Sequence, residues 1–249
     1  MTGDRLTVRL CHLYPDLMNI YADRGNIAVF ERRLTWRGHE LQVTPISIGD
    51  PIEAEFDLYY LGGGQDRDQD LVADDLQAKA APLRAAADAQ AAQLYVCGGI
   101  QLAGHGYVAR NGDRLPGTGV LDLETTAGNS RLIGDLVIDA ELGSETRRIV
   151  GYENHAGRTS LGSGCRPLGR VVHGHGNDGV SGFEGAVRDR VIGTYLHGPL
   201  LPKNPSIADL LLTWALEHRY GAGVELEPLD DSLERSAHAA AERRAGVSR

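Results

Sequence analysis

The sequence predicts an α/β fold, a single domain with a central, mostly parallel β-sheet flanked by helices and with added antiparallel strands in its second half. The first half alternates short apolar runs with segments at helical spacing, which is typical of a parallel sheet covered on both faces. The second half holds short β-rich pieces separated by Gly, Asn and Asp. With 249 residues, 42% of them hydrophobic, the chain can bury a sizeable core.

The first half predicts successive βα units. Each apolar run indicates a buried strand, and glycines mark the points where strands or helices end. In chain order we expect strands at residues 5–14, 38–46, 56–64 and 93–99 and helices at residues 22–36 and 70–92.

The second half predicts antiparallel or mixed pairing before a closing amphipathic helix at residues 206–221. Residues 232–249 are charged and form either a docking helix or a frayed tail. We therefore expect the domain to span residues 1–230, with 231–249 as a charged C-terminal helix or tail. The expected strands of this half lie at residues 120–125, 132–142, 147–155, 169–174 and 190–198.

Composition excludes several classes of function. The formal charge of −9 and the lack of a Lys/Arg cluster argue against nucleic-acid binding. Charged residues come too early for a signal peptide, and no apolar run approaches the length of a membrane span, so we expect a cytoplasmic protein without direct membrane insertion. Cys11, Cys97 and Cys165 are widely spaced and odd in number, which favours reduced thiols.

Cys97 differs from the other two cysteines in its neighbours. It ends an apolar strand and precedes Gly98 and Gly99, as in a nucleophile elbow, where a tight strand-to-helix turn presents the side chain. A buried structural cysteine would fit the strand equally well. The second signal is His197, which follows another late apolar strand in "VIGTYLHGPL" and could serve as the base that a thiol nucleophile needs.

A third strand end carries the glycines of "LYYLGGGQDRDQD". Backbone N–H groups at Gly63 and Gly64 could point at a developing oxyanion, although a plain βα turn explains the same glycines. No Lys-Ser/Thr pair follows in P-loop spacing, so a nucleotide site is not expected here. His173 and His175 near Cys165 lack a convincing fourth ligand, and we expect no metal site.

These motifs together carry a resemblance to a known family. The run Cys97-Gly98-Gly99-Ile100-Gln101 resembles the C-x-G-x-Q core of class I (triad-type) glutamine amidotransferases, whose domain is flavodoxin-like. "VCGGIQLAGHGY" with "GTYLHGPLL" is similar to the cobyric-acid-synthase-like (CobB/CobQ) branch. Further segments resemble the glutaminase subunits of that branch that work with a Mur-ligase-type protein: "LYPDLMNIYADRGN", "LGGGQDRDQ", "NSRLIGDL", "YENHAGRT" and "LLPKNPSIAD".

The resemblance implies hydrolysis of L-glutamine to glutamate and ammonia through a thioester. Cys97 would be the nucleophile and His197 the residue that accepts and returns its proton. Backbone N–H groups of Gly98 and of the Gly63–Gly64 turn would form the oxyanion hole. The implied glutamine-binding side chains are Gln101, Arg131, Asn154 and His155, with Arg131 pairing with the α-carboxylate.

One departure concerns the third member of the triad. Many class I enzymes carry an acid two residues after the histidine, whereas this chain has Pro199 there. The resemblance implies that a MurT-like subunit supplies an acid in trans within a heterodimer. It also implies that this partner binds ATP and magnesium, with no cofactor on the present chain. The ammonia would then amidate the D-glutamate α-carboxyl of lipid II to D-isoglutamine in peptidoglycan synthesis.

Other functions stay open at this point. The ammonia could serve a different acceptor of the cobyric-acid type, the chain could be a stand-alone thiol hydrolase, or it could be a non-catalytic binding module in which Cys97 is structural. The segment from Tyr14 to Asn26, with Asp16, Asn19 and Asp23, is either a capped βα connection or a functional surface.

Overall fold

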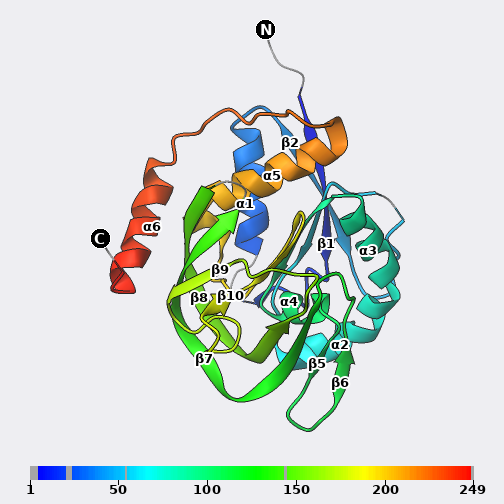
Figure 1. The fold of residues 1–249 in the computed structure, drawn as a ribbon. Coiled ribbons are helices and arrows are strands. Elements are labelled where there is room, and N and C mark those ends of the chain that lie inside the picture. Colours follow the sequence, from blue (N-terminus) through cyan, green and yellow to red (C-terminus); the bar gives the residue numbers. More distant parts are fainter. Residues whose placement is uncertain (1–4, 21–23, 54, 143–144, 248–249) are drawn as a thin grey trace.

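The computed structural model describes residues 5–20, 24–53, 55–142 and 145–247, so Asp23 lies outside the described residues. A six-stranded sheet forms the centre of the molecule, in the order β11-β12-β4-β3-β1-β2 (Figure 1). Neighbouring strands are parallel except for the β11–β12 pair. The strands are β1 (Thr7–Leu13), β2 (Glu40–Ile46), β3 (Leu58–Leu61), β4 (Ala92–Val96), β11 (Ala186–Arg188) and β12 (Val191–Thr194).

Helices cover both faces of this sheet, as expected for parallel strands. One expectation was wrong, because the single helix at 70–92 is two helices that meet at Lys79, and β4 already begins at Ala92. Pro82 explains the break, since it lacks the N–H that would continue the helix from Ala78. The helices are α1 (Arg24–Thr35), α2 (Asp66–Ala78), α3 (Ala80–Asp88), α4 (Gly98–Ala103), the short 3₁₀ turn η2 (Leu201–Lys203), α5 (Pro205–Tyr220) and α6 (Ser232–Arg244).

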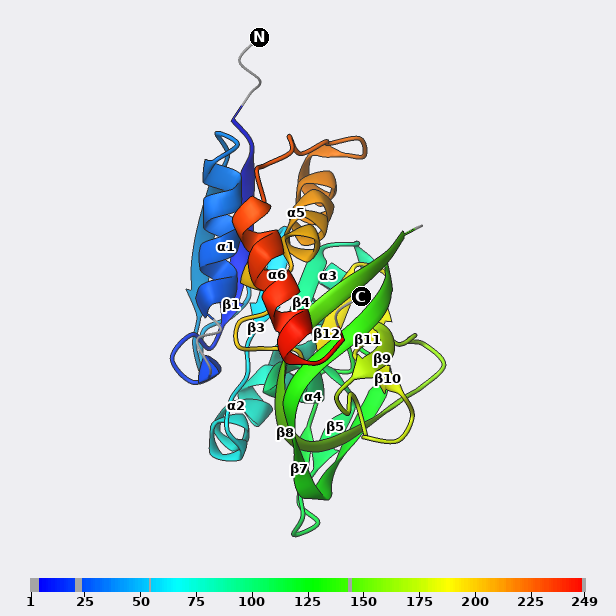
Figure 2. The ribbon, with the colours of Figure 1, turned by 90° about the vertical axis from the view of Figure 1, so that its left-hand side faces the viewer.

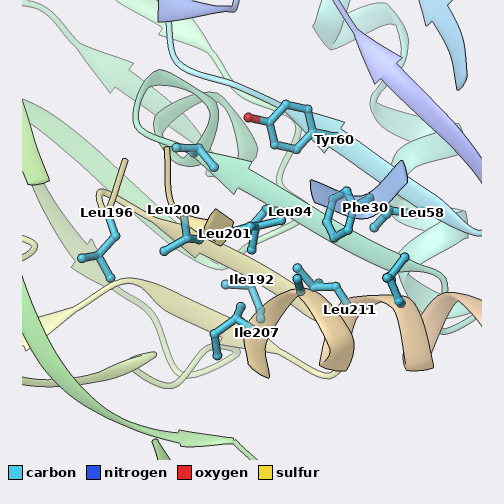
Figure 3. Packing of buried hydrophobic residues seen from close by; sticks show 14 of the residues in the cluster. Phe30, Leu58, Tyr60, Leu94, Ile192, Leu196, Leu200, Leu201, Ile207 and Leu211 are labelled. Carbon is cyan, nitrogen blue, oxygen red and sulfur yellow. The ribbon is translucent and has the colours of Figure 1, made fainter. Parts of the chain in front are cut away.

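The core divides according to the alternation of side chains along the strands. Leu58 and Leu94 point to one face, where Phe30 of α1 and Leu211 of α5 cover them (Figure 3). Tyr95 points to the other face, into a second cluster built with α2, α3 and α4. Because both faces are buried, the carboxyl ends of the strands form the edge at which side chains can reach a ligand.

A second sheet is added in the latter half, as the sequence predicted. Its longest part is the antiparallel β7–β8 pair, which runs beside α6 and down to the level of α4 (Figure 2). Two backbone hydrogen bonds between Tyr152 and His197 connect it to the segment after β12. The strands are β5 (Gly106–Val108), β6 (Arg114–Pro116), β7 (Leu123–Leu142), β8 (Glu145–Leu161), β9 (Gly169–His173) and β10 (Phe183–Glu184).

The charged tail contains a docked helix, α6, which lies against the outer side of β7, β8 and η2 (Figures 1 and 2). None of its own residues is buried, and Ala241 packs against an apolar cluster of Val137, Val150 and Ala245. Across the described part of the chain, no helix is both long and apolar enough to cross a bilayer.

Candidate functional site

Cys97 sits at a strained turn between β4 and α4. Its backbone has φ 54° and ψ −109°, an unusual conformation for a residue with a side chain. The Cys97 N–H donates to Thr194 O at 2.8 Å, which fixes the turn to the end of β12. A Cβ at Gly99 would lie 2.5 Å from Leu61 O, so only glycine lets α4 approach β3 this closely. This geometry is that of a nucleophile elbow.

The two glycine turns singled out in the sequence meet beside the elbow. A Cβ added at Gly98 would lie 3.1 Å from the Gly64 nitrogen, so the backbones after β3 and β4 are in close contact. Gly63 O accepts a hydrogen bond from Ile20 N at 3.0 Å, which ties this turn to the segment that follows β1. The backbones of both turns thus meet at one place.

A cavity of about 330 Å³ opens in front of Cys97. It brings together four of the residues expected from the sequence, Cys97, Gly64, Arg131 and Asn154. Its size suits a small ligand such as an amino acid, and its lining is mainly polar. The remaining lining residues are Ile20, Gln65, Asp66 and Arg67.

Arg131 is held in place by its own strand pair. It lies where the β7–β8 register shifts between Ala127 and Leu132, and such a bulge re-aims a side chain. The Arg131 Nε donates to Asn154 Oδ1 at 2.7 Å and Nη2 donates to Asn154 O at 2.8 Å. Arg158 donates to Ser130 O at 3.0 Å and so anchors the bulge. The guanidinium therefore reaches the cavity in a fixed orientation.

His197 lies two residues after Tyr195, just beyond β12, and its side chain is 1% exposed. Its ring lies edge-on to Tyr152, with the centroids 6.0 Å apart. Burial is the main cause that lowers the pKa of His197 to about 4, and the charge of nearby Lys203 adds to it. The imidazole is therefore neutral at physiological pH, the form in which it can accept a proton.

Gln101 and His155 are in a second layer and do not line the cavity. His155 is 2% exposed and stacks on Tyr195 at 3.6 Å between ring centroids. Gln101 Nε2 donates to the Tyr195 hydroxyl at 3.3 Å. Tyr195 thus holds both residues behind the pocket, a role that its place in "GTYLHG" could have suggested.

Buried Glu153 is another residue that the sequence reasoning missed, although it lies within the quoted "YENHAGRT". Its carboxylate accepts hydrogen bonds from the backbone N–H groups of His175 and Gly176 at 2.6 and 3.0 Å, and it faces His155 Nε2 at 3.5 Å. These interactions lower the pKa of Glu153 despite its burial. His175 Nδ1 also lies 2.9 Å from Glu153 Oε1, and the described residues contain no group of three His, Cys, Asp or Glu side chains that could hold a metal ion.

The Cys97 elbow, the glycine turn at Gly64 and Arg131 with Asn154 meet at one polar cavity, which makes this place the candidate functional site. Comparison with known families agrees, since residues 9–205 match the CobB/CobQ-like glutamine amidotransferase domain. The chain belongs to this family and is a glutamine amidotransferase.

Two curated relatives are similar over most of both chains. Both are named "Lipid II isoglutaminyl synthase (glutamine-hydrolyzing) subunit GatD". The protein from Streptococcus pneumoniae is 39% identical over 228 residues, covering 91% of this chain and 87% of its own. The one from Staphylococcus aureus is 38% identical over 218 residues, covering 87% and 86%.

More distant similarity extends to cobyric acid synthases and to the fold of solved structures. The cobyric acid synthase of Pelotomaculum thermopropionicum is 33% identical over 77% of this chain and 40% of its own length. "Structure of PurLQS from Thermotoga maritima" matches with a TM-score of 0.55 at 16% identity, covering 85% of this chain and 94% of that chain. "Crystal structure of glutamine amidotransferase" also gives 0.55, at 14% identity, covering 82% and 98%. These matches confirm the expected fold class.

Proposed function

We propose that this chain is the glutaminase subunit of a lipid II isoglutaminyl synthase and that it hydrolyses L-glutamine through a thioester on Cys97. One observation carries the catalytic part of the proposal. The strained Cys97 elbow opens into the same cavity as Gly64, Arg131 and Asn154. The names of the two GatD relatives support the biological role.

In the proposed reaction, His197 takes the proton of the Cys97 thiol and the sulfur attacks the side-chain amide carbon of glutamine. Backbone N–H groups of Gly98 and the Gly63–Gly64 turn stabilise the oxyanion. His197 returns the proton to the leaving nitrogen, so that ammonia departs and the γ-glutamyl thioester remains. Water then attacks the thioester, its proton passes through His197 back to the sulfur, and glutamate leaves.

Arg131 is proposed to bind the α-carboxylate of glutamine through its guanidinium. Asn154 orients that guanidinium through the two hydrogen bonds described above. Gln101 and His155 would support the pocket from behind through Tyr195.

The low pKa of His197 is one reason to propose an acid from a partner. When His197 receives a proton it must hold a positive charge at a buried position, where the charge of Glu153 offsets only part of the cost, and Pro199 offers no carboxylate. A carboxylate from a MurT-type ligase would stabilise the imidazolium and hold the correct tautomer. We therefore propose weak glutaminase activity for the chain alone and stronger activity in the heterodimer.

The same partner is proposed to carry the ATP and magnesium chemistry. It would activate the α-carboxyl of the stem-peptide D-glutamate of lipid II, and ammonia released at Cys97 would convert that group to the amide. A cobyric-acid-type acceptor is the second candidate, supported by the more distant similarity to cobyric acid synthases.

The decisive experiment measures ammonia and glutamate release from L-glutamine by the chain alone and with a MurT-type ligase, with Cys97→Ala as the control. The proposal expects release that depends on Cys97 and rises with the ligase. Adding lipid II and ATP should then yield amidated lipid II. Equal rates with and without the ligase would refute the acid in trans, and no release under either condition would refute the glutaminase.

A further inference from the structure

A fully buried carboxyl group lies behind the proposed site and has no part in the mechanism above. Glu184, at the end of β10, is 0% exposed. Its Oε1 accepts hydrogen bonds from Tyr195 N at 2.7 Å and from the Thr194 hydroxyl at 3.0 Å. Its Oε2 has no hydrogen-bond partner among the described residues. Burying a carboxyl group with an unpaired oxygen costs free energy, so the hydrogen bonds that Glu184 makes indicate why it is there.

Glu184 holds the corner at which β12 ends. There the chain leaves β4, and the N–H groups of Tyr195 and Leu196 need acceptors inside the core. Glu184 accepts the first, and the Thr194 hydroxyl accepts the second at 3.0 Å. Thr194 O in turn accepts the Cys97 N–H at 2.8 Å. The Cys97 amide is therefore bound to this corner, and His197 follows directly after it.

The same corner carries the side chain that supports the pocket. The Tyr195 hydroxyl is 2.6 Å from Thr159 Oγ1 and accepts from Gln101 Nε2, while its ring stacks on His155. A shift of the Tyr195 backbone would thus move the supporting layer as well as the segment leading to His197.

We infer that Glu184 is a positioning residue for glutamine hydrolysis, because its carboxyl fixes the Thr194–Leu196 corner on which the Cys97 elbow and His197 both depend. This inference rests on the proposed roles of Cys97 and His197. Glu184 acts through the backbone and does not line the cavity, so its loss lowers kcat more than it raises KM.

The test compares Glu184→Ala with Glu184→Gln, which keeps an oxygen acceptor of the same length. Active sites are counted with a diazo-ketone analogue of glutamine that alkylates nucleophilic thiols, so kcat is expressed per competent molecule. Since misplacement by about 1 Å costs on the order of 100-fold, we expect Glu184→Ala to lower kcat about 10- to 100-fold with KM within about threefold. Glu184→Gln should stay within about threefold of the wild type, because the bond to Tyr195 N persists.

Asp57→Asn is the matched control. Asp57 is also 0% exposed and accepts a hydrogen bond from the backbone N–H of Arg9 at 2.8 Å. It lies at the amino end of β3, away from the carboxyl ends of the strands where the proposed site lies. This variant should lower thermal stability and leave kcat per active site unchanged. If Glu184→Ala behaves like Asp57→Asn, Glu184 is merely structural and the inference is wrong.

Three further outcomes are informative. If Glu184→Gln lowers kcat as much as Glu184→Ala does, an oxygen acceptor for Tyr195 N is not what the site needs, and the inference is wrong. If Glu184→Ala does not fold, Thr194→Val tests the same corner, since it removes the hydroxyl that links Glu184 to Leu196 N. A normal kcat in Thr194→Val would then overturn the inference. Absence of any Cys97-dependent hydrolysis in the wild type would instead refute the proposed function itself.

Discussion

At the scale of single residues, the proposed site depends on how Arg131 and His197 are oriented. Arg131 uses two of its nitrogens to bind Asn154, which fixes the plane of the guanidinium at the cavity. Burial lowers the pKa of His197 to about 4, so its imidazole is neutral down to low pH. The Arg131 guanidinium is thus oriented to bind an anion, and the neutral His197 imidazole is able to accept a proton.

Replacing Arg131 with Lys should raise KM for glutamine about tenfold, because an ammonium cannot keep both Asn154 contacts and a bidentate carboxylate pair. We expect kcat to change less than KM. Steady-state kinetics of glutamate release measure both, and Arg114→Lys, in an exposed pair with Glu124, is the matched control. A KM equal to the wild-type value would exclude Arg131 from carboxylate binding.

The pKa of His197 predicts the pH profile of the chain alone. Since burial lowers that pKa to about 4, kcat/KM should fall on the acid side only near pH 4, and not near the ordinary histidine value of about 6.5. A partner carboxylate would raise the pKa and move this limb upward. Profiles measured with and without the ligase test both statements, and an acid limb near pH 6.5 without partner would contradict the first.

At the scale of elements, the elbow is built from the close approach of α4 to the end of β3. This contact requires glycine at Gly99, whose missing Cβ leaves room for Leu61 O and Gly62 O. The same approach brings Gly98 against Gly64. The spacing of strand β3 and helix α4 therefore determines the geometry of the expected oxyanion hole.

Gly99→Ala should force α4 away from β3 and lower both the stability and the reactivity of Cys97. Overpacking of this kind costs about 1–3 kcal/mol, and here the obstacle is backbone that cannot rotate away. Thermal unfolding and the rate of Cys97 alkylation report the two effects. Gly164→Ala is the control, because the atoms nearest to its Cβ belong to the partly exposed side chain of Asp122 and not to backbone. Unchanged alkylation in Gly99→Ala would show that the elbow tolerates a wider spacing.

At the scale of the whole molecule, α6 is attached by ion pairs and by a small apolar contact of Ala241 and Ala245 with Val137 and Val150, and a buried ion pair precedes it. Asp231 binds the buried Arg33 at 2.7 Å, and Arg33 also pairs with Asp209 of α5. Within α6, Glu242 pairs with Arg148 at 3.4 Å at a partly exposed position. The boundary expected at residue 230 therefore falls beside the Asp231 pair that anchors the tail.

Truncation can separate these two contributions. A chain ending at Asp231 should lose about 1–2 kcal/mol of unfolding free energy, because the ion pairs of α6 contribute little and its removal uncovers Val137 and Val150. A chain ending at Pro228 should lose about 1–3 kcal/mol more, because one carboxylate of buried Arg33 disappears. Urea unfolding measures both, and equal losses would contradict the role assigned to Asp231.

Buried titratable groups also predict how stability depends on pH. Burial lowers the pKa of His12 and of His197 to about 4, so the unfolded chain binds more protons there and stability falls as pH drops from about 6.5 to 4. Burial raises the pKa of Glu184 from 4.5 to about 8, so the folded chain holds the extra proton and stability falls as pH rises through that range.

These opposite slopes place the maximum of stability near pH 6.5, the ordinary histidine pKa. Urea unfolding at pH 5, 6.5 and 8 should show the maximum, and Glu184→Gln should flatten the decline from 6.5 to 8. If stability declines equally in Glu184→Gln and the wild type, groups other than Glu184 cause the decline.

The sequence by itself determined the alternating strands and helices, the Cys97 elbow and the strand-end position of His197. These features depend on local patterns, because glycines mark tight turns and parallel strands present their carboxyl ends at one edge. Only the tertiary structure decided that Arg131 binds Asn154, that Gly98 meets Gly64, that His155 stands behind the pocket and that Glu184 supports the corner before His197. Those contacts join segments that are distant in the chain, and they follow from strand register and close packing, which no local pattern specifies.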